Sequence, residues 1–258
     1  MAKAGDSKKR ETVTAALIII GDEILSGRTK DENIGYAADY LTEIGIQLRE
    51  VRIIGDDEAH IVDTVNAMRA SYTYVFTTGG IGPTHDDITA DSIAKAFGVG
   101  IDIDERALAQ MRERYSADKL TPARLRMARI PDGAELVANS VSLTPGFMIE
   151  NVIVMAGVPR IMQVMLDAVT PQLRTGAKML TRTVRVEAPE GDVAPGLGRL
   201  QAEFADVAMG SYPFFDKGML GTNLVLRSTD EDLLGRAFDA TLAMLQAEGI
   251  SEFRAVEG

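Results

Sequence analysis

The chain has 258 residues, 46% hydrophobic and 25% charged, which is the composition of a globular protein and not of a disordered one. It contains no cysteine, which excludes disulfides, thiolate metal sites and a cysteine nucleophile, and its two histidines, His60 and His85, are too few for a multi-histidine zinc site. The formal net charge of −11 predicts a surface that repels a phosphate backbone, so we expect no nucleic-acid partner.

An anionic ligand would therefore have to be received locally, by backbone N–H groups, a few basic side chains or a bound cation. No apolar run approaches the roughly 20 residues of a membrane-spanning helix. The initial stretch MAKAGDSKKR is not followed by the apolar segment of a signal peptide. We expect a cytoplasmic protein with no membrane partner.

Strands and helices alternate along the first two thirds of the chain. AALIII (15–20) is a continuous apolar run stopped by a glycine, which is typical of a strand buried on both faces of a parallel sheet. A helix is predicted from Asn33 to Ile44, with Gly45 at its C-terminal cap. The elements predicted after it are a strand at 46–55, a helix at 58–70, a strand at 72–78, helices at 89–97, 105–116 and 121–129, a hairpin at 147–157 and a helix at 159–169.

This order predicts a three-layer α/β/α domain with a mostly parallel central sheet over residues 12–174. A polar link with Pro171 and Gly176 follows, and we predict a small α+β domain over 177–254. Its predicted order is βαββα: a strand at 181–188, a helix at 197–204, strands at 206–212 and 220–228, and a final helix after Thr229. Within it, the aromatic rings of GSYPFF (210–215) are expected to pack in the core, the alternative being presentation to a flat ligand.

Ligands of open α/β sheets bind beyond the carboxyl ends of the parallel strands, and three loops of this chain lie there, at 21–27, 79–87 and 157–160. In the second loop, Gly79, Gly80 and Gly82 allow backbone N–H groups to approach a phosphate, and Asp86 and Asp87 suit a magnesium ion that bridges to it. A glycine-rich turn with helix-capping aspartates explains the same residues equally well.

The first loop, GDEILSGRTKDEN (21–33), departs from the phosphate-binding loop of ATPases, because Gly27 comes one position late and Arg28 replaces the lysine. Asp22 and Glu23 either join Asp87 around a metal ion or cap the following turn. There is no G-x-S-x-G motif and no serine partner for either histidine, so we do not expect a hydrolase triad.

TTGGIGPTHDDITADSIAKAFG (77–98) resembles the signature of the molybdopterin-binding (MoaB/Mog-like) superfamily. The form is that of the N-terminal half of CinA proteins and of the molybdopterin-binding-like region of eukaryotic FAD synthases. Further segments match that pattern in order, namely GDEILSG (21–27), Asn33, NSVSLTPGF (139–147) and MAGVPRIM (155–162). The resemblance covers residues 15 to about 170, and the rest resembles the small domain that follows in CinA-type chains.

The resemblance implies a pocket for a phosphate-bearing nucleotide or pterin, with a divalent metal such as Mg²⁺. Asp86 and Asp87 would be catalytic, and Asp22, Glu23 and Asp87 would hold the metal. The predicted ligand-binding residues are Asn33, Thr78, Gly79, Gly80, Gly82, Thr84, Thr144, Gly146 and Gly157. Relatives form dimers or trimers, which implies a homo-oligomer. The printed sequence has no counterpart of the CinA amidohydrolase domain, so we expect no deamidase activity.

Pterin-handling members of the superfamily activate molybdopterin by adenylyl transfer, whereas CinA-type and FAD-synthase-type modules are associated with hydrolysis of a pyrophosphate linkage. Since the motif is CinA-like, the expected function is metal-dependent hydrolysis of a nucleotide pyrophosphate of the ADP-ribose or FAD type. The alternatives are a non-catalytic molybdopterin- or nucleotide-binding protein and a molybdopterin adenylyl-transfer protein of molybdenum cofactor biosynthesis, with molybdopterin as the ligand.

Overall fold

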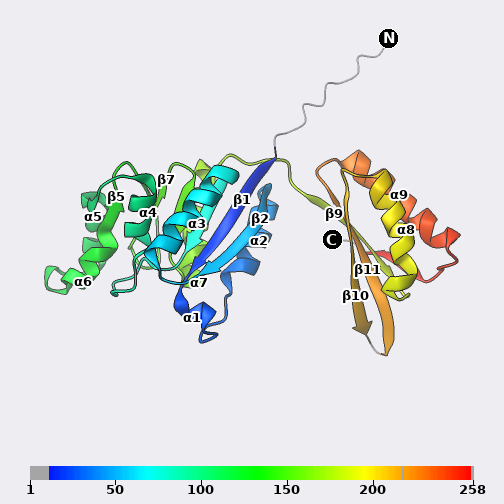
Figure 1. Cartoon of the computed structure of the whole chain (residues 1–258), viewed down its shortest axis with the longest axis horizontal. Coiled ribbons are helices and arrows are strands. Elements are labelled where there is room, and N and C mark those ends of the chain that lie inside the picture. The colour runs from blue at the N-terminus through cyan, green and yellow to red at the C-terminus, as the bar shows by residue number, and fades with distance from the viewer. Residues whose placement is uncertain (1–11, 217, 257–258) are drawn as a thin grey trace, which may run out of the picture. The chain divides into compact units, whose positions relative to one another are not determined.

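The computed structural model describes residues 12–216 and 218–256, and this part divides between Gly176 and Ala177 into two compact units (Figure 1). The N-terminal stretch in which we expect no signal peptide lies outside the described residues. No helix in the described ranges is long and apolar enough to cross a membrane.

The first unit is built on a six-stranded sheet with the order β2-β1-β3-β8-β7-β6. Four neighbouring strands are parallel, namely β2 (Ile46–Ile54), β1 (Val13–Ile20), β3 (Tyr74–Thr78) and β8 (Val152–Met155). The other two complete one edge: β7 (Gly146–Ile149) runs antiparallel to β8, and β6 (Glu135–Val137) runs antiparallel to β7. The predicted mostly parallel sheet is confirmed, as is the hairpin that joins β7 to β8.

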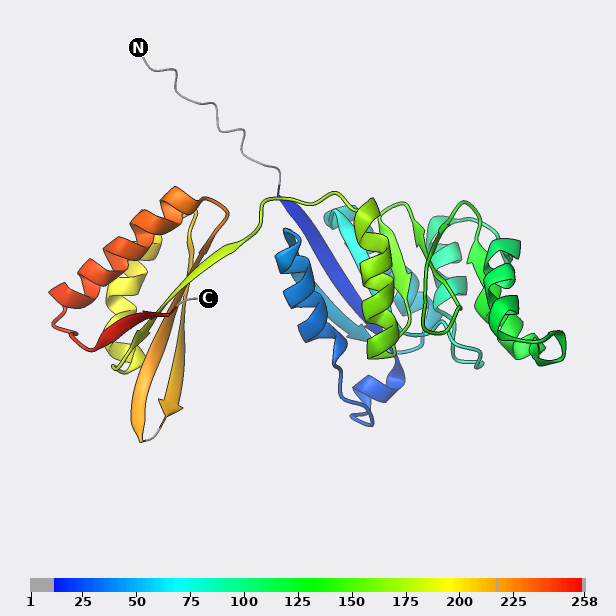
Figure 2. The same cartoon turned by 180° about the vertical axis from the view of Figure 1, so that it is seen from behind.

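Helices cover both faces of this sheet. One face packs against α2 (Asn33–Glu43) and α7 (Pro159–Val169), which lie in front of the sheet in Figure 2. The other packs against α3 (Glu58–Ser71) and α4 (Thr89–Phe97). Strand β1 supplies both cores, since Ile18 and Ile20 face α3 and α4 while Leu17 and Ile19 face the opposite side. Its continuous apolar run is thereby explained.

The remaining segments of the first unit are short, and the sequence predicted them less well. A short helix α1 (Asp22–Leu25) follows β1, and β4 (Ile101–Ile103) pairs with β5 (Arg129–Pro131) beside α5 (Glu105–Arg114). The single helix expected over 121–129 is instead α6 (Pro122–Leu125) followed by one 3₁₀ turn at 126–128. Arg129 leaves the helix to join β5, where its guanidinium pairs with Asp91 at 2.7 Å.

The second unit is a four-stranded antiparallel sheet with two helices on one face. Its elements are β9 (Leu180–Val186), α8 (Glu190–Glu203), β10 (Ala208–Asp216), β11 (Met219–Ser228), α9 (Glu231–Ala247) and β12 (Phe253–Val256). The strand order is β10-β11-β9-β12, so the unit is a split-βαβ (ferredoxin-like) fold with the order βαββαβ. The core lies between the sheet and the helices, where Val184, Val186 and Leu224 meet Leu197, Phe238 and Leu245.

Three details of this unit differ from the expectation. The sequence missed β12, and α8 begins at Glu190 instead of near Leu197. Strand β10 continues through Pro213, which is tolerated because β10 is an edge strand. The prediction that the aromatic segment 210–215 packs in the core is wrong, because Tyr212 and Phe215 are 49% and 76% exposed.

Candidate functional site

The glycine-rich loop after β3 has a backbone that requires glycine. Gly79 and Gly80 have φ angles of +101° and +65°. A Cβ on Gly79 would lie 2.1 Å from the carbonyl oxygen of Ile20 at the end of β1. One on Gly80 would lie 2.1 Å from Oγ1 of Thr89, a fully buried residue that opens α4. Thr89 holds the loop in return, since its N–H donates to Gly80 O and its hydroxyl to Gly79 O, both at 3.0 Å.

The backbone donors of this loop are divided between the fold and the site. The N–H of Gly79 donates to the carbonyl of Met155 in β8 at 3.1 Å, so it is not available to a ligand. In contrast, the N–H groups of Gly80, Ile81 and Gly82 have no hydrogen-bond partner within the described residues. The helix that follows, α4, has no side-chain cap. Consecutive free N–H groups beside a helix N-terminus form a concavity that suits an anion.

Asp87 closes the loop back on itself. Its Oδ2 accepts hydrogen bonds from the N–H and the hydroxyl of Thr84 at 2.8 and 2.5 Å. Gly82 leaves the room this needs, since a Cβ there would lie 2.6 Å from the same oxygen. The predicted residues Gly82, Thr84 and Asp87 therefore lie together, and the carboxylate of Asp87 faces the loop that it orders.

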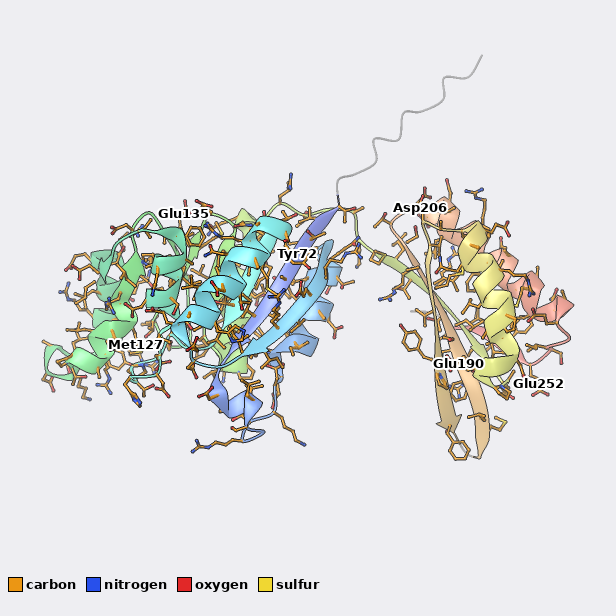
Figure 3. The ribbon with its side chains drawn as sticks, in the orientation of Figure 1. Tyr72, Met127, Glu135, Glu190, Asp206 and Glu252 are labelled. Carbon is orange, nitrogen blue, oxygen red and sulfur yellow. The ribbon has the colours of Figure 1, made fainter. Side chains whose placement is uncertain are left out.

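Arg126 supports the loop from behind, although no motif in the sequence distinguishes it. Its Nη2 donates to the backbone carbonyl of Asp87 at 3.1 Å, while its Nε is buried without a partner in the described residues. A small cavity of about 20 Å³, room for about one water molecule, lies here. It is lined by Gly80, Ile81, Gly82, Asp87, Ala90, Asp91, Arg126, Met127, Arg129, Ile130, Pro145 and Phe147. Figure 3 labels Met127 among them.

Three other predicted residues meet the glycine loop from neighbouring elements. Asn33, the first residue of α2, is 4% exposed, and its Nδ2 donates to the carbonyl of Gly157 at 2.9 Å. Gly157 in turn contacts the backbone of Gly79, since a Cβ on Gly157 would lie 3.2 Å from Gly79 Cα. The Oδ1 of Asn33 and the Oγ1 of Thr78 are buried without a partner in the described part of the chain. Unpaired buried acceptors and hydroxyls are costly, so they are suited to a polar ligand or an ordered water.

Thr144 and Gly146 lie on the far side of this region. The backbone carbonyl of Thr144 accepts a hydrogen bond from Nδ2 of Asn139 at 2.9 Å. Gly146 is buried in β7, where a Cβ would lie 2.1 Å from the carbonyl oxygen of Val154. Only Pro145, between them, lines the small cavity beside the loop. Gly146 thus serves the close packing of two strands.

Acidic side chains gather at the ends of β1 and β2. The N–H of Asp22 donates to Oδ2 of Asp56 at 3.0 Å. The pKa of Asp56 is raised, first by burial and then by the charges of Asp22, Glu23 and Asp86, while the hydrogen bond from Asp22 opposes the shift. Asp86 thus joins Asp22 and Glu23 in this group. No three histidine, aspartate or glutamate side chains in the described ranges form a group that could hold a metal ion by themselves. The metal-binding role of Asp22, Glu23 and Asp87 stays a prediction.

The sequence contained a signal for Asp56 that we did not use. The segment IIGDD (53–57) repeats the pattern of IIGDE (19–23), and both place Gly-Asp directly after a parallel strand. Because β1 and β2 are neighbours with the same direction, the two segments end at the same edge.

The raised pKa of Asp56 has a consequence for stability. In the folded chain Asp56 holds its proton to a higher pH than in the unfolded chain, so its contribution is fully favourable below its ordinary pKa of 3.8 and is lost as the pH rises through the folded value. We therefore expect Asp56→Asn to raise the melting temperature at pH 7 and to lose this advantage at pH 4. Asp57→Asn removes an equal charge next door and keeps a cap for α3, so it is the matched control. An equal gain in the control would contradict the local cause.

Comparison with protein families gives a match for each unit. Residues 16–175 match the family described as "Probable molybdopterin binding domain". Residues 178–254 match the family described as "FAD synthase, middle domain".

Individual relatives agree with both matches. A protein of Pyrococcus furiosus is 31% identical, over 93% of this chain and 98% of its own length. A "Probable FAD synthase" of Caenorhabditis elegans is 30% identical over 86% of this chain, which spans 48% of the relative. Among solved structures, the protein CinA from Thermoplasma acidophilum is 35% identical with a TM-score of 0.59, over 63% of this chain and 99% of that one.

Proposed function

Since this chain belongs to the molybdopterin-binding domain family, in the branch that resembles CinA, we propose that it binds a phosphate-bearing nucleotide or pterin at the loop after β3. In this proposal it also hydrolyses, with a divalent metal, a nucleotide pyrophosphate of the ADP-ribose or FAD type. The family match supports a small-molecule pterin or nucleotide as the ligand. The relative described as a FAD synthase and the match of residues 178–254 support the choice of a dinucleotide.

The observation that carries this proposal is the set of three consecutive N–H groups in front of α4, at Gly80, Ile81 and Gly82, that have no hydrogen-bond partner among the described residues. They let an acidic chain accept a polyanion locally, because the donors are part of the backbone and the first turn of α4 adds its positive end. Preorganised donors of this kind stabilise charge that develops on phosphoryl oxygens. Asn33 at the start of α2 and Thr78 at the end of β3 offer further polar atoms.

The residues present fit a metal that arrives with the ligand. Magnesium in nucleotide sites is usually held by one or two carboxylates together with phosphates and water, so a complete protein cage is not required. We propose that Asp22 and Asp86 hold it, with Glu23 beside them. When bound, the ion would polarise the phosphoryl oxygens and neutralise their charge.

The acids of the chain have separate roles in this proposal. Asp87 orders the loop through Thr84, so that the free N–H groups keep their positions. The pKa of Asp86 is lowered, chiefly by a hydrogen bond from Thr84, which keeps this exposed carboxylate ionised beside the ligand. Asp56, whose pKa is raised, is the better acceptor for the proton of an attacking water.

Incubation with ADP-ribose or FAD and Mg²⁺ tests the hydrolysis directly. We expect release of AMP from either compound, measured by chromatography, and none in the presence of a chelator. Asp56→Asn should lower kcat by roughly 100-fold, the usual size of a lost proton acceptor. Lys95→Gln, on the exposed side of α4 and paired with Glu58, is a control that should keep full activity. Absence of AMP from both substrates over a long incubation would rule the hydrolysis out.

The second candidate is a non-catalytic protein that holds a pterin or nucleotide, or one that takes part in molybdopterin adenylyl transfer. It is supported by the family match of residues 16–175, because that family is described by binding and not by a reaction. Calorimetric binding of molybdopterin or ADP-ribose without any product would select the binding protein. Formation of an adenylylated pterin from ATP would select the transfer reaction.

A further inference from the structure

The second unit carries an organised row of side chains on the face of its sheet that is opposite the helices. The strand register places Tyr212 of β10 opposite Asn223 of β11, Asn223 opposite Arg185 of β9, and Arg185 opposite Arg254 of β12. These four residues form a straight line across all four strands. Since neighbouring strands lie about 4.8 Å apart, the line spans roughly 14 Å.

A second row beside the first is made of smaller side chains. Val225, Thr183 and Val256 are paired across β11, β9 and β12 in the same way, two residues along each strand. Together the two rows line a shallow hollow of about 380 Å³. The lining residues are Thr183, Arg185, Tyr212, Asn223, Val225, Arg254 and Val256. Both rows therefore contribute to the lining of one hollow on the same face of the sheet.

Two glycines let the aromatic rings of this face lie flat. A Cβ on Gly210 would be 3.1 Å from the ring of Tyr212, so that ring lies over Gly210. Similarly, a Cβ on Gly221 would be 2.2 Å from the ring of Phe214. The Arg185 guanidinium stacks on Phe214, 3.5 Å from the ring centroid. Tyr212 remains 49% exposed, which leaves it free to stack with a planar group.

The charge of this face is opposite to that of the chain. On this face the described residues of the four strands include the arginines 185, 227 and 254 but one acid, Asp216, which is paired with Arg185 at 3.3 Å. Arg182 lies on the other face, over the ring of Phe238 in α9. Arg254 has no ion-pair or hydrogen-bond partner in the described part, although it stands directly opposite Arg185. The other acids of the unit belong to helices and connections, such as Glu190, Asp206 and Glu252 (Figure 3). Like charges directly opposite in a sheet are unfavourable until an anion lies between them.

We propose that this face binds a free nucleoside diphosphate, with the base stacked on Tyr212 and the phosphates between Arg185 and Arg254. Asn223, next to Tyr212 in the row, is placed to hydrogen-bond the edge of the base. The length of the row suits one such molecule. A second copy of the same face is a poor occupant, because the arginines of the two copies would repel one another and each copy brings a single acid to this face. This site lies in a different unit from the loop after β3, and it does not rest on the proposed function.

Photolabelling of the full chain with 8-azido-ADP, followed by trypsin and mass spectrometry, tests this site separately from the first. Cleavage after Arg199 and Lys217 gives the peptide 200–217, which contains Tyr212, whereas the loop after β3 lies in the peptide 70–95. We expect labelling of 200–217 that unlabelled ADP suppresses. It should fall about tenfold in Arg254→Gln and in Tyr212→Ala, since each loses one principal contact. Label in 70–95 reports only on the first site.

Arg236→Gln is the matched control, because it removes the same charge from the exposed side of α9. It should label like the unmodified chain. The proposal is overturned if 200–217 carries no label that ADP suppresses, or if Arg254→Gln and Arg236→Gln label equally. Stronger suppression by single-stranded oligoadenylate than by ADP, at equal nucleotide concentration, would overturn the free nucleotide in favour of nucleic acid.

Discussion

Replacing Gly80 with alanine is expected to destabilise the chain by roughly 2–4 kcal/mol and to weaken nucleotide binding by at least about 100-fold. The new methyl group would lie 2.1 Å from Thr89 Oγ1, and Thr89 is fully buried, so it has no space to withdraw. The φ of +65° adds strain for any residue with a Cβ. Relief requires the loop to move, which displaces the free N–H groups. Urea unfolding and calorimetry with ADP-ribose measure the two effects.

Gly27→Ala separates the clash from the backbone strain. Gly27 has a similar φ of +71°, but a Cβ there meets no atom within 4 Å. We expect it to cost about 1 kcal/mol, the strain alone, and to leave affinity unchanged. A second variant, Gly80→Ala combined with Thr89→Ser, keeps the clashing hydroxyl. It should therefore be no more stable than Gly80→Ala alone. Equal losses in Gly80→Ala and Gly27→Ala would show that the contact with Thr89 is unimportant.

Asp87→Ala is expected to lower kcat/KM for ADP-ribose by about 100-fold or more, with most of the loss in binding. The substitution removes the acceptor of both Thr84 hydrogen bonds, so residues 82–87 lose the contact that closes the turn. Three N–H groups that are no longer held in one orientation cannot converge on a phosphate. Steady-state kinetics and calorimetry on the same preparation measure the two parts.

Asp87→Asn distinguishes loop ordering from metal binding. Asparagine keeps an oxygen that can accept both hydrogen bonds from Thr84 but carries no charge. If Asp87 acts by ordering the loop, this variant should stay within about tenfold of the unmodified chain and keep its dependence on Mg²⁺ concentration. A loss equal to that of Asp87→Ala, with a higher Mg²⁺ requirement, would assign the carboxylate to the metal instead.

The parts of the fold that the sequence predicted are those in which one strong local pattern decides the structure. The apolar run at 15–20 has no alternative to a doubly buried strand, and Pro159 with the apolar residues after it marks α7. The failures have weak or conflicting local signals. Helix α8 contains Pro195 and three glycines in its interior, and its stability comes from packing against the sheet. Strand β12 has four residues, and only pairing with β9 makes it a strand.

The candidate site was predicted to a similar extent, for a related reason. The glycine loop is visible in the sequence because its backbone restricts the residue type, and Asn33 is visible because it matches the pattern of the family. The group of acids at the ends of β1 and β2 is not visible in the sequence. Asp56 follows β2, and its distance from Asp22 depends on which strand lies beside β1. The role of Asp87 is not visible either, because its place in the sequence suits a metal ligand as well as a hydrogen-bond partner for Thr84. Only the side-chain geometry distinguishes the two.

The meeting of Gly79 with Ile20 and Gly157 has an evolutionary consequence. Where main chain contacts main chain, this backbone base of the site offers no side chain at the contact that a mutation could enlarge, shrink or recharge. Such a base recognises the common part of many metabolites and is indifferent to what is attached to it. Relatives that process different compounds would then diverge in the side chains that flank these loops, such as the exposed Leu25 of α1 and Val158 directly after Gly157, while keeping the same base.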